Sequence, residues 1–336
     1  MSGVYYRPLV QIGDARPSGA LRIAGGWGWA AHVERMERDR GGAVVPEADL
    51  PPDVRARLSA PRGAIAGLAM DRPRLMGILN VTPDSFSDGG LYAAPGVAAL
   101  QGAALVAGGA DILDIGGEST RPGAETVPED VEIQRVEPVI AALHQGLPTP
   151  ISIDTRKAAV AEAAFEAGAA MLNDVAALSF DAQLASVAAA RGVPVCLMHA
   201  QGDPKTMQAS PRYADVLLDV YDFLEARIAV AVAAGIDRAR ILVDPGIGFG
   251  KTLEHNLSLL RGLSLFHGLG CPILIGASRK RFIGTLSGAE APDARMPGSV
   301  AVALAAVAQG VQIVRVHDIH ATKQALTLWT AATGQS

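Results

Sequence analysis

Eight short apolar runs recur along this chain from residue 75 onward, and each ends in polar residues that could hold a ligand. In chain order they are LMGILN, DILDIGG, ISID, MLND, VCLMH, ILVD, ILIGAS and IVRVH. Ala-rich stretches of helical periodicity lie between them, near residues 95–107, 128–145, 157–168, 181–191, 213–234, 253–268, 297–309 and 321–332. Eight such strand–helix units predict an α/β fold, a TIM (β/α)8 barrel, whose loops after the strands build the active site at one face.

Three loops after these strands are long, polar and rich in glycine, namely 80–90, 116–124 and 276–284. They follow the first, second and seventh strands. Because a barrel holds the ends of such loops while their tips stay mobile, loops at this face carry function. Three of them, beside Asp and Asn residues at neighbouring strand ends, indicate one active site.

Composition narrows the possible partners. With 49% hydrophobic but only 4% aromatic residues, the core must consist of Ala, Val, Ile and Leu, which suits parallel strands buried on both faces. The net charge is −5 and no run is rich in lysine or arginine, so no nucleic-acid partner is expected.

Cys196 and Cys271 fall inside strand runs and are expected as buried thiols. No apolar stretch predicts a membrane span and no signal-peptide pattern begins the chain, so we expect a cytoplasmic protein.

Residues 1–72 differ from the repeating part, so we predict an N-terminal extension there and the barrel over residues 73–336. The extension holds Tyr and Trp residues in a Gly-rich setting, and then prolines that argue against one continuous helix. A small sheet element near 21–31 and one short helix near 52–59 are expected. Packing against the barrel's flank or bottom and a partly mobile leader are both open, and the role of the extension is not indicated.

Eight motifs follow one another over about residues 73–336: MGILNVTPDSFSDGG, DIGGESTRPGA, SIDTRK, LNDV, LMHAQGDPKTMQ, DPGIGFGKTLEHN, GASRKRFIG and RVHDI. Their composition and order resemble those of the dihydropteroate synthase family. The resemblance implies a transferase that condenses (7,8-dihydropterin-6-yl)methyl diphosphate with 4-aminobenzoate, giving dihydropteroate and diphosphate in folate biosynthesis. The chain departs from the family in its longer leader, and in Ala200, where many members carry a bulkier residue.

The resemblance implies a pocket for a pterin ring, whose amino–oxo edge presents both donors and acceptors. A buried carboxylate can accept its N–H bonds and a nearby amide can satisfy what remains, a clamp that we assign to Asp244 and Asn173. Lys280 would donate to the ring carbonyl and a ring nitrogen, and Phe249 would cover the ring. Because a buried unpaired group costs roughly 1–3 kcal/mol, the clamp would be selective. The alternative for Asp244 is a turn former at a strand end.

The diphosphate requires positive charge, which Arg121, Arg315 and His317 would supply. Asn80 is the expected oxygen ligand of Mg²⁺, an ion that takes one or two protein ligands together with waters and phosphate oxygens. Thr120 would donate to the ring or to a phosphate. The alternative for Arg315 is a barrel-lining residue that balances a carboxylate.

Asp154 is the candidate for stabilising the charge that develops on the methylene carbon, and with Lys280 and Arg121 it forms the expected catalytic set. A dissociative, carbocation-like path needs no strong general base. The alternative is that Asp154 anchors its strand end or pairs with Arg156. Ser278 and the start of the helix after it would meet the carboxylate of 4-aminobenzoate.

His199, at the end of the fifth strand run, is expected to be structural. In the first long loop, Asp84, Ser85 and Phe86 are expected from the resemblance to close over the second substrate.

Two other functions stay open. A pterin-dependent methyltransferase has a similar barrel but needs neither of the first two long loops. A pterin-binding paralogue that has lost catalysis would have decayed loops, and here both are whole. Because the family is usually dimeric through helices on one side of the barrel, we expect a homodimer in which the helices near 299–309 and 321–332 could take part.

Overall fold

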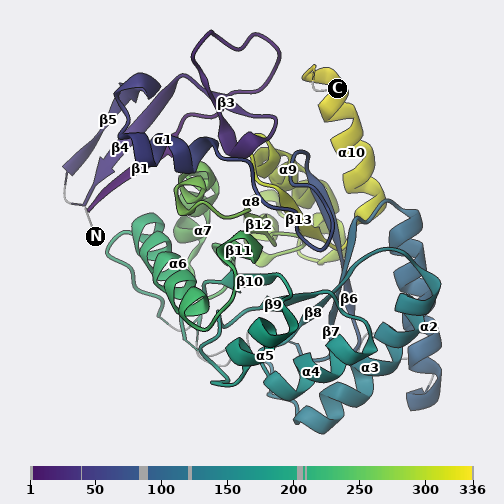
Figure 1. The fold of residues 1–336 in the computed structure, drawn as a ribbon. Coiled ribbons are helices and arrows are strands. Elements are labelled where there is room, and N and C mark those ends of the chain that lie inside the picture. Colours follow the sequence, from purple (N-terminus) through teal and green to yellow (C-terminus); the bar gives the residue numbers. More distant parts are fainter. Residues whose placement is uncertain are drawn as a thin grey trace.

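Eight parallel strands form a closed barrel at the centre of the computed structural model (Figure 1). They are β6 (Arg74–Asn80), β7 (Ile112–Gly116), β8 (Ile151–Asp154), β9 (Met171–Asp174), β10 (Val195–Met198), β11 (Ile241–Asp244), β12 (Leu274–Ile275) and β13 (Ile313–Val316). Hydrogen-bonded neighbours run in the order β11-β10-β9-β8-β7-β6-β13-β12, and a parallel bridge between Val243 and Ile273 closes the ring. The predicted barrel is confirmed. The structure describes residues 3–38, 40–82, 90–119, 123–202, 207–208 and 210–334, without the side chains of 90–95.

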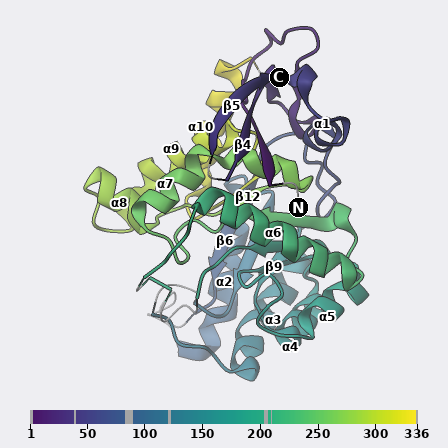
Figure 2. The same cartoon turned by 90° about the vertical axis from the view of Figure 1, so that its left-hand side faces the viewer.

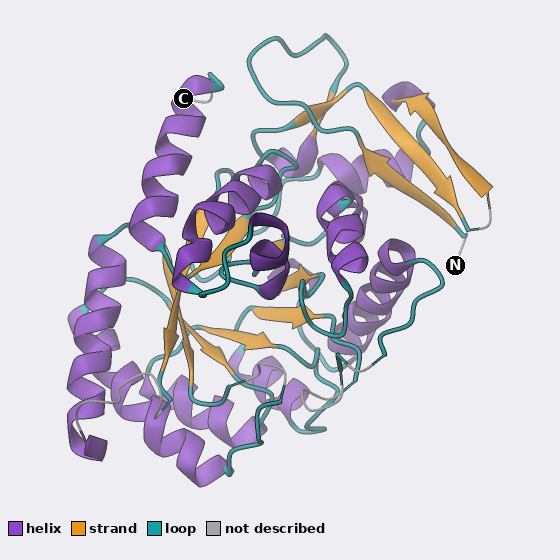
Figure 3. Ribbon diagram, turned by 180° about the vertical axis from the view of Figure 1, so that it is seen from behind, coloured by secondary structure: helices purple, strands orange, loops and turns teal. Residues whose placement is uncertain are grey.

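Helices surround the strands (Figure 3). They are α2 (Gly90–Ala107), α3 (Glu129–Gly146), α4 (Ala158–Ala167), α5 (Leu184–Arg191), α6 (Val216–Ala233), α7 (Leu253–Arg261), α8 (Arg281–Ser287), α9 (Met296–Val307) and α10 (Ile319–Ala332). The helix expected over 253–268 ends earlier, at Arg261, and a 3-10 helix, η5 (Leu263–Leu269), follows Gly262. Helix α8 is the helix expected after Ser278, and it begins at Arg281, inside the loop expected over 276–284. Within the described residues, no helix is long and apolar enough to cross a bilayer.

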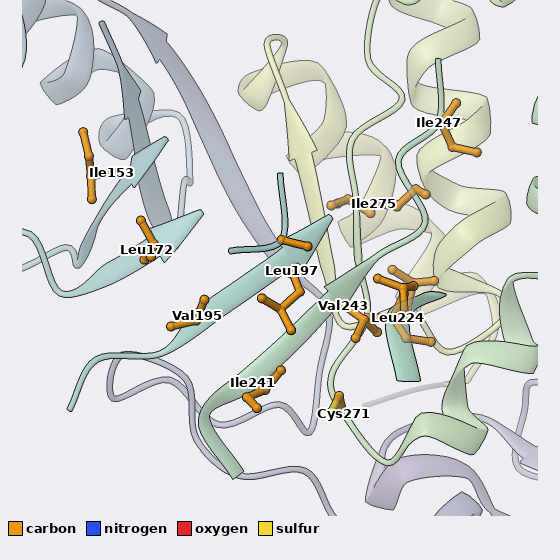
Figure 4. Close-up of a cluster of buried hydrophobic side chains, with 14 of the residues drawn as sticks. Ile153, Leu172, Val195, Leu197, Leu224, Ile241, Val243, Ile247, Cys271 and Ile275 are labelled. Atoms are coloured by element: carbon orange, nitrogen blue, oxygen red, sulfur yellow. The ribbon is translucent and has the colours of Figure 1, made fainter. Parts of the chain in front are cut away.

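The barrel interior changes character along the strands. Successive strand residues point to opposite faces, so alternate positions point inward. At the amino ends the inward side chains are apolar and fully buried: Met76, Ile112, Met171, Cys196, Leu242, Leu274 and Ile313. Two residues further along β7, β9, β11 and β13 the inward side chains are Asp114, Asn173, Asp244 and Arg315. The outward side chains, such as Leu172 of β9 and Val195 of β10, belong to the same apolar cluster as helix residues such as Leu224 of α6 (Figure 4).

The N-terminal segment forms a small sheet beside the barrel (Figure 2). Its elements are the antiparallel sheet β1 (Val4–Pro8), β4 (His32–Glu37) and β5 (Arg40–Pro46), the pair β2 (Leu21–Arg22) and β3 (Trp29–Ala30), and α1 (Pro52–Ser59). Helix α1 lies where it was expected, and β2 and β3 make up the element expected near 21–31. The three-stranded sheet was missed, because HVERME and RGGAVVP show no apolar alternation.

This segment packs against the flank of the barrel through specific hydrogen bonds. The Trp27 Nε1 donates to the Val307 carbonyl at 2.9 Å, and the Ser264 Oγ donates to the Pro8 carbonyl at 2.8 Å. The Arg38 guanidinium lies 2.7 Å from the Asp222 carboxylate of α6. Ile65 and Met70 of the same segment also pack into the apolar layer at the amino end of the barrel. Of the two open alternatives, the structure therefore shows packing, on both the flank and the bottom of the barrel.

We predict that Leu242→Ala lowers the free energy of unfolding by about 2–5 kcal/mol, because it leaves a cavity in the apolar layer that closes the barrel. Leu100→Ala on α2 is the matched control, since Leu100 is 74% exposed, and should change stability by less than about 0.5 kcal/mol. Urea unfolding measures both values. Equal effects would contradict a packed layer at Leu242.

Candidate active site

Arg315 lies at the centre of the polar layer inside the barrel. Its Nε donates to the Asp114 Oδ2 at 2.5 Å and its Nη2 donates to the Asp154 Oδ2 at 2.8 Å. The same Asp114 oxygen accepts a hydrogen bond from the Asn173 Nδ2 at 3.1 Å. Burial alone would lower the pKa of Arg315, but Asp114 and Asp154 raise it above its usual value. Strands β7, β8, β9 and β13 thus contribute one connected group of side chains.

Asp154 is buried and only half satisfied. Its Oδ1 has no hydrogen-bond partner, while its Oδ2 pairs with Arg315. Burial raises the pKa of Asp154 to about 7, although Arg315 acts in the opposite direction. The sequence left open a pairing of Asp154 with Arg156. The structure instead pairs Arg156 with Glu118, at 2.9 Å.

Asp244, Phe249 and Lys280 lie together on the neighbouring side of the barrel mouth. The Asp244 Oδ1 accepts the Gly246 N–H at 2.7 Å, and the Lys280 Nζ donates to the Ile247 carbonyl and lies 4.4 Å from the centre of the Phe249 ring. Burial lowers the pKa of Lys280 to about 7 against the pull of Asp244. Arg315 also lowers the pKa of Lys280 and Asp154 raises it, so the two groups of residues lie close enough to act on each other electrostatically.

Two backbone features hold this side of the mouth. Gly246 has φ +67°, and a Cβ there would lie 1.9 Å from the His199 carbonyl oxygen, so glycine is required. Arg279 has φ +58°, an uncommon value for a residue with a side chain. The surrounding contacts hold Arg279 in this conformation. Its guanidinium pairs with Asp318 at 2.6 Å, and its backbone N–H donates to the Ser299 Oγ at 2.8 Å. This turn places Ser278 and Lys280 on either side of Arg279.

Ser278 and His317 face each other beside the pocket. The Ser278 Oγ lies 3.0 Å from the His317 Nδ1 and accepts the His317 backbone N–H at 3.2 Å. They end the β12 and β13 runs, as the barrel pattern predicted.

The His199 side chain is held by neighbouring side chains of the protein. Its Nδ1 lies 2.8 Å from the Lys251 Nζ, and its ring lies 4.7 Å from the Phe223 ring in an edge-to-face arrangement. Burial lowers the pKa of His199 to about 2. Lys251 also donates to the Phe249 carbonyl at 2.9 Å, so this pair ties the end of β10 to the loop after β11.

A buried network that the sequence did not indicate anchors the loop after β7. The Lys157 Nζ lies 2.7 Å from the Glu118 carboxylate and 2.5 Å from the Glu132 carboxylate. The Thr155 Oγ1 donates to Glu132 at 2.9 Å. Burial acts to raise the pKa of Glu118, but Lys157 and the Val127 N–H leave it lowered overall. These contacts fix the start of the loop that carries Thr120 and Arg121.

Several predicted site residues lie outside the described residues: Thr120, Arg121, Asp84, Ser85 and Phe86. Asn80 is described at the end of β6, where it is half-buried. No cluster of three or more His, Cys, Asp or Glu side chains that could hold a metal ion occurs in the described ranges.

Comparisons with known proteins find related sequences over the whole barrel. The family model described as pterin binding enzyme matches residues 76–317. The dihydropteroate synthase of Neisseria meningitidis serogroup C is 51% identical over 267 residues, which cover 79% of this chain and 94% of that protein. The Escherichia coli K12 dihydropteroate synthase is 47% identical over 259 residues, 77% of this chain and 91% of that protein.

Solved structures agree. The Xanthomonas albilineans dihydropteroate synthase with 4-aminobenzoic acid has a TM-score of 0.76 at 50% identity, and covers 81% of this chain and 98% of that chain. The same enzyme in complex with 7,8-dihydropteroate has a TM-score of 0.74 at 47% identity, with the same coverage of both chains.

We predict that Lys157→Met lowers the free energy of unfolding by about 3–5 kcal/mol, because it leaves the Glu132 carboxylate buried without a cationic partner and the Glu118 carboxylate with Arg156 alone. The matched control is Arg191→Met, which breaks an exposed pair with Glu166 and should change stability by less than about 1 kcal/mol. Urea unfolding compares the two. A small, similar loss in both would show that the network stabilises nothing.

Proposed function

This chain belongs to the dihydropteroate synthases of the pterin-binding enzyme family, and from that premise we infer the reaction at its barrel mouth. It condenses (7,8-dihydropterin-6-yl)methyl diphosphate with 4-aminobenzoate to give 7,8-dihydropteroate and diphosphate, in folate biosynthesis. The observation that carries this conclusion is the match to dihydropteroate synthases over the whole barrel, at 44–51% identity. A pterin-dependent methyltransferase and a non-catalytic paralogue are less favoured for the same reason.

The pterin clamp is supported by the free acceptors in the pocket. Asp244 uses one carboxylate oxygen for the Gly246 N–H, which leaves Oδ2 for ring N–H groups. Asn173 uses its amide nitrogen for Asp114, which leaves its amide oxygen. Lys280 lies beside Phe249 and can donate to ring acceptors while the Phe249 ring covers the pterin. Together they match the donors and acceptors of an amino–oxo edge.

We assign the diphosphate to Arg315 and His317 together with Thr120 and Arg121. The Arg315 side chain is 20% exposed, although it pairs with two carboxylates. It can therefore both balance charge inside the barrel and bind the diphosphate, the two roles that the sequence left open. Asn80 would hold Mg²⁺, since its side-chain oxygen is a hard ligand at the end of β6. When bound, the ion would neutralise charge on the leaving diphosphate.

In the chemical step the carbon–oxygen bond to diphosphate breaks, the amine of 4-aminobenzoate forms the new carbon–nitrogen bond, and the nitrogen loses a proton. Asp154, with one oxygen free of hydrogen bonds, would stabilise the positive charge on the methylene carbon. Ser278 would bind the carboxylate of 4-aminobenzoate, and His317 would hold the Ser278 hydroxyl in place.

We also propose a cytoplasmic homodimer. Leu328 on α10 is 66% exposed, which supports an apolar contact between copies through that helix. Cys196 and Cys271 are buried free thiols, which suits a reducing compartment.

The direct test mixes both substrates with Mg²⁺ and measures diphosphate release. Lys280→Ala should abolish measurable pterin binding in calorimetry, since it removes a donor from the clamp, whereas Lys323→Ala on the exposed face of α10 should bind like the parent. Pyrophosphate and Mg²⁺ together should raise the melting temperature of the parent more than either does alone. Parent protein that releases no diphosphate would refute the function, and normal pterin affinity in Lys280→Ala would refute the clamp.

We predict that Asp154→Asn lowers kcat and kcat/KM together by on the order of 10²–10³, because the carboxylate acts on charge that develops during the reaction. Since the pKa of Asp154 is about 7 and its ionised form is the active one, the parent rate should fall as the pH drops below 7. The variant should lack this acidic limb.

Single-turnover cleavage beside a melting curve separates this role from anchoring. Asp181→Asn is the control, because Asp181 accepts the backbone N–H groups of Ala158 and Gln183. It should melt earlier and cleave at the parent rate. The same behaviour in Asp154→Asn would leave Asp154 as a strand anchor.

A further inference from the structure

We propose that Asp114 is the positioning residue of the pterin pocket: it decides which side of the Asn173 amide faces the ligand and where the Arg315 guanidinium lies. The proposal rests on the function above and adds a residue that contacts neither substrate. Asp114 is 0% exposed, so it acts on ligands through its hydrogen bonds to Asn173 and Arg315 and through its charge.

The orientation of Asn173 follows from the chemistry of its neighbour. An amide is nearly symmetric in shape, but one end donates and the other accepts hydrogen bonds. An ionised carboxylate only accepts, so the Asp114 Oδ2 must face the Asn173 Nδ2, as it does at 3.1 Å. The amide oxygen of Asn173 is thereby left for the ligand. A pocket with this acceptor selects a ring that presents N–H groups, and a flipped amide would reject it.

The placement of Arg315 follows from the same oxygen. Asp114 accepts a hydrogen bond from the Nε and Asp154 accepts one from the Nη2. Two of the three guanidinium nitrogens are therefore held by carboxylates on adjacent strands. Among the described residues, no acceptor binds the Nη1. The edge of the guanidinium that carries Nε and Nη2 is therefore fixed, and the Nη1 can donate to a phosphate oxygen.

Asp114 also sets the charge around Asp154. The charged groups that face Asp154 are Arg315 of β13, Asp114 of β7, Glu132 of α3, Asp174 of β9 and Lys280 at the start of α8. Arg315 lowers the pKa of Asp154, whereas Asp114 raises it. Neutralising Asp114 should move the pKa of Asp154 down, both by removing a negative charge and by leaving Arg315 with one carboxylate partner.

Two variants separate these roles. Asp114→Ala removes the acceptor, so the Asn173 amide loses its fixed orientation, and the affinity for a pterin without diphosphate should fall about tenfold or more. Asp114→Asn keeps an oxygen that can accept from both partners but removes the charge. Its pterin affinity should stay within about threefold of the parent value, while the acidic limb of the rate profile moves about one pH unit lower.

The matched control is Asp111→Asn, next to the start of the same strand. Asp111 also binds an arginine, Arg74 at 3.3 Å, and a backbone N–H, that of Leu75 at 2.9 Å, but at the opposite end of the barrel. This variant should lose stability and keep both the parent pterin affinity and the parent pH limb.

Calorimetry with the pterin, the pH dependence of kcat/KM and a melting curve are measured on each full-length variant. Parent affinity in Asp114→Ala, or an unmoved limb in Asp114→Asn, would overturn the proposal. So would equal losses of affinity in Asp111→Asn, since general destabilisation would then explain them. If Asp114→Ala does not fold, the position of the acidic limb in the pH–rate profile of Asp114→Asn tests the proposal. Parent protein that neither binds the pterin nor releases diphosphate would refute the proposed function instead.

Discussion

Charge buried inside a closed barrel must find a partner there, and Arg315 pairs with both Asp114 and Asp154. The three residues come from strands that are neighbours or near neighbours in the ring, so they meet only when the barrel closes. Removing one partner would leave an uncompensated charge away from water, which is strongly unfavourable. The apolar layer below them closes the amino end of the barrel and keeps that end dry. Shape and charge of the pocket thus both depend on strand register.

The strand-end residues could be predicted because two local patterns coincide there. A buried run of four to six apolar residues indicates a strand, and the polar residue at its end stands out against that run, as Asp154 and Asp244 do. The network of Glu118, Glu132 and Lys157 could not be found this way. Lys157 is 39 residues from Glu118 and 25 from Glu132, and each lies in a segment that is polar anyway. Asp114 was missed for a related reason: one acid within a buried strand has no signal until its partner 201 residues away is known.

The N-terminal segment shows another limit of local patterns. The family match begins at residue 76, so the sheet of β1, β4 and β5 lies before it. Its docking residues Trp27 and Arg38 contact α9 and α6, which follow more than 170 residues later in the chain. The segment has a small apolar cluster of its own, with Val33 and Leu58 fully buried. Its order depends on the barrel surface as much as on its own sequence.

The shifted pKa values of Asp154 and Lys280 make the stability of the fold depend on pH. The pKa of Asp154 is raised from 3.8 to about 7, so the folded state binds more protons than the unfolded chain between those values, and stability falls as the pH rises. The pKa of Lys280 is lowered from 10.5 to about 7, so the unfolded chain binds more protons above 7 and stability rises with pH there. The two slopes meet near neutrality, where the burial of these two groups contributes least to the stability of the fold, and a ligand that pairs with their charged forms would offset that cost.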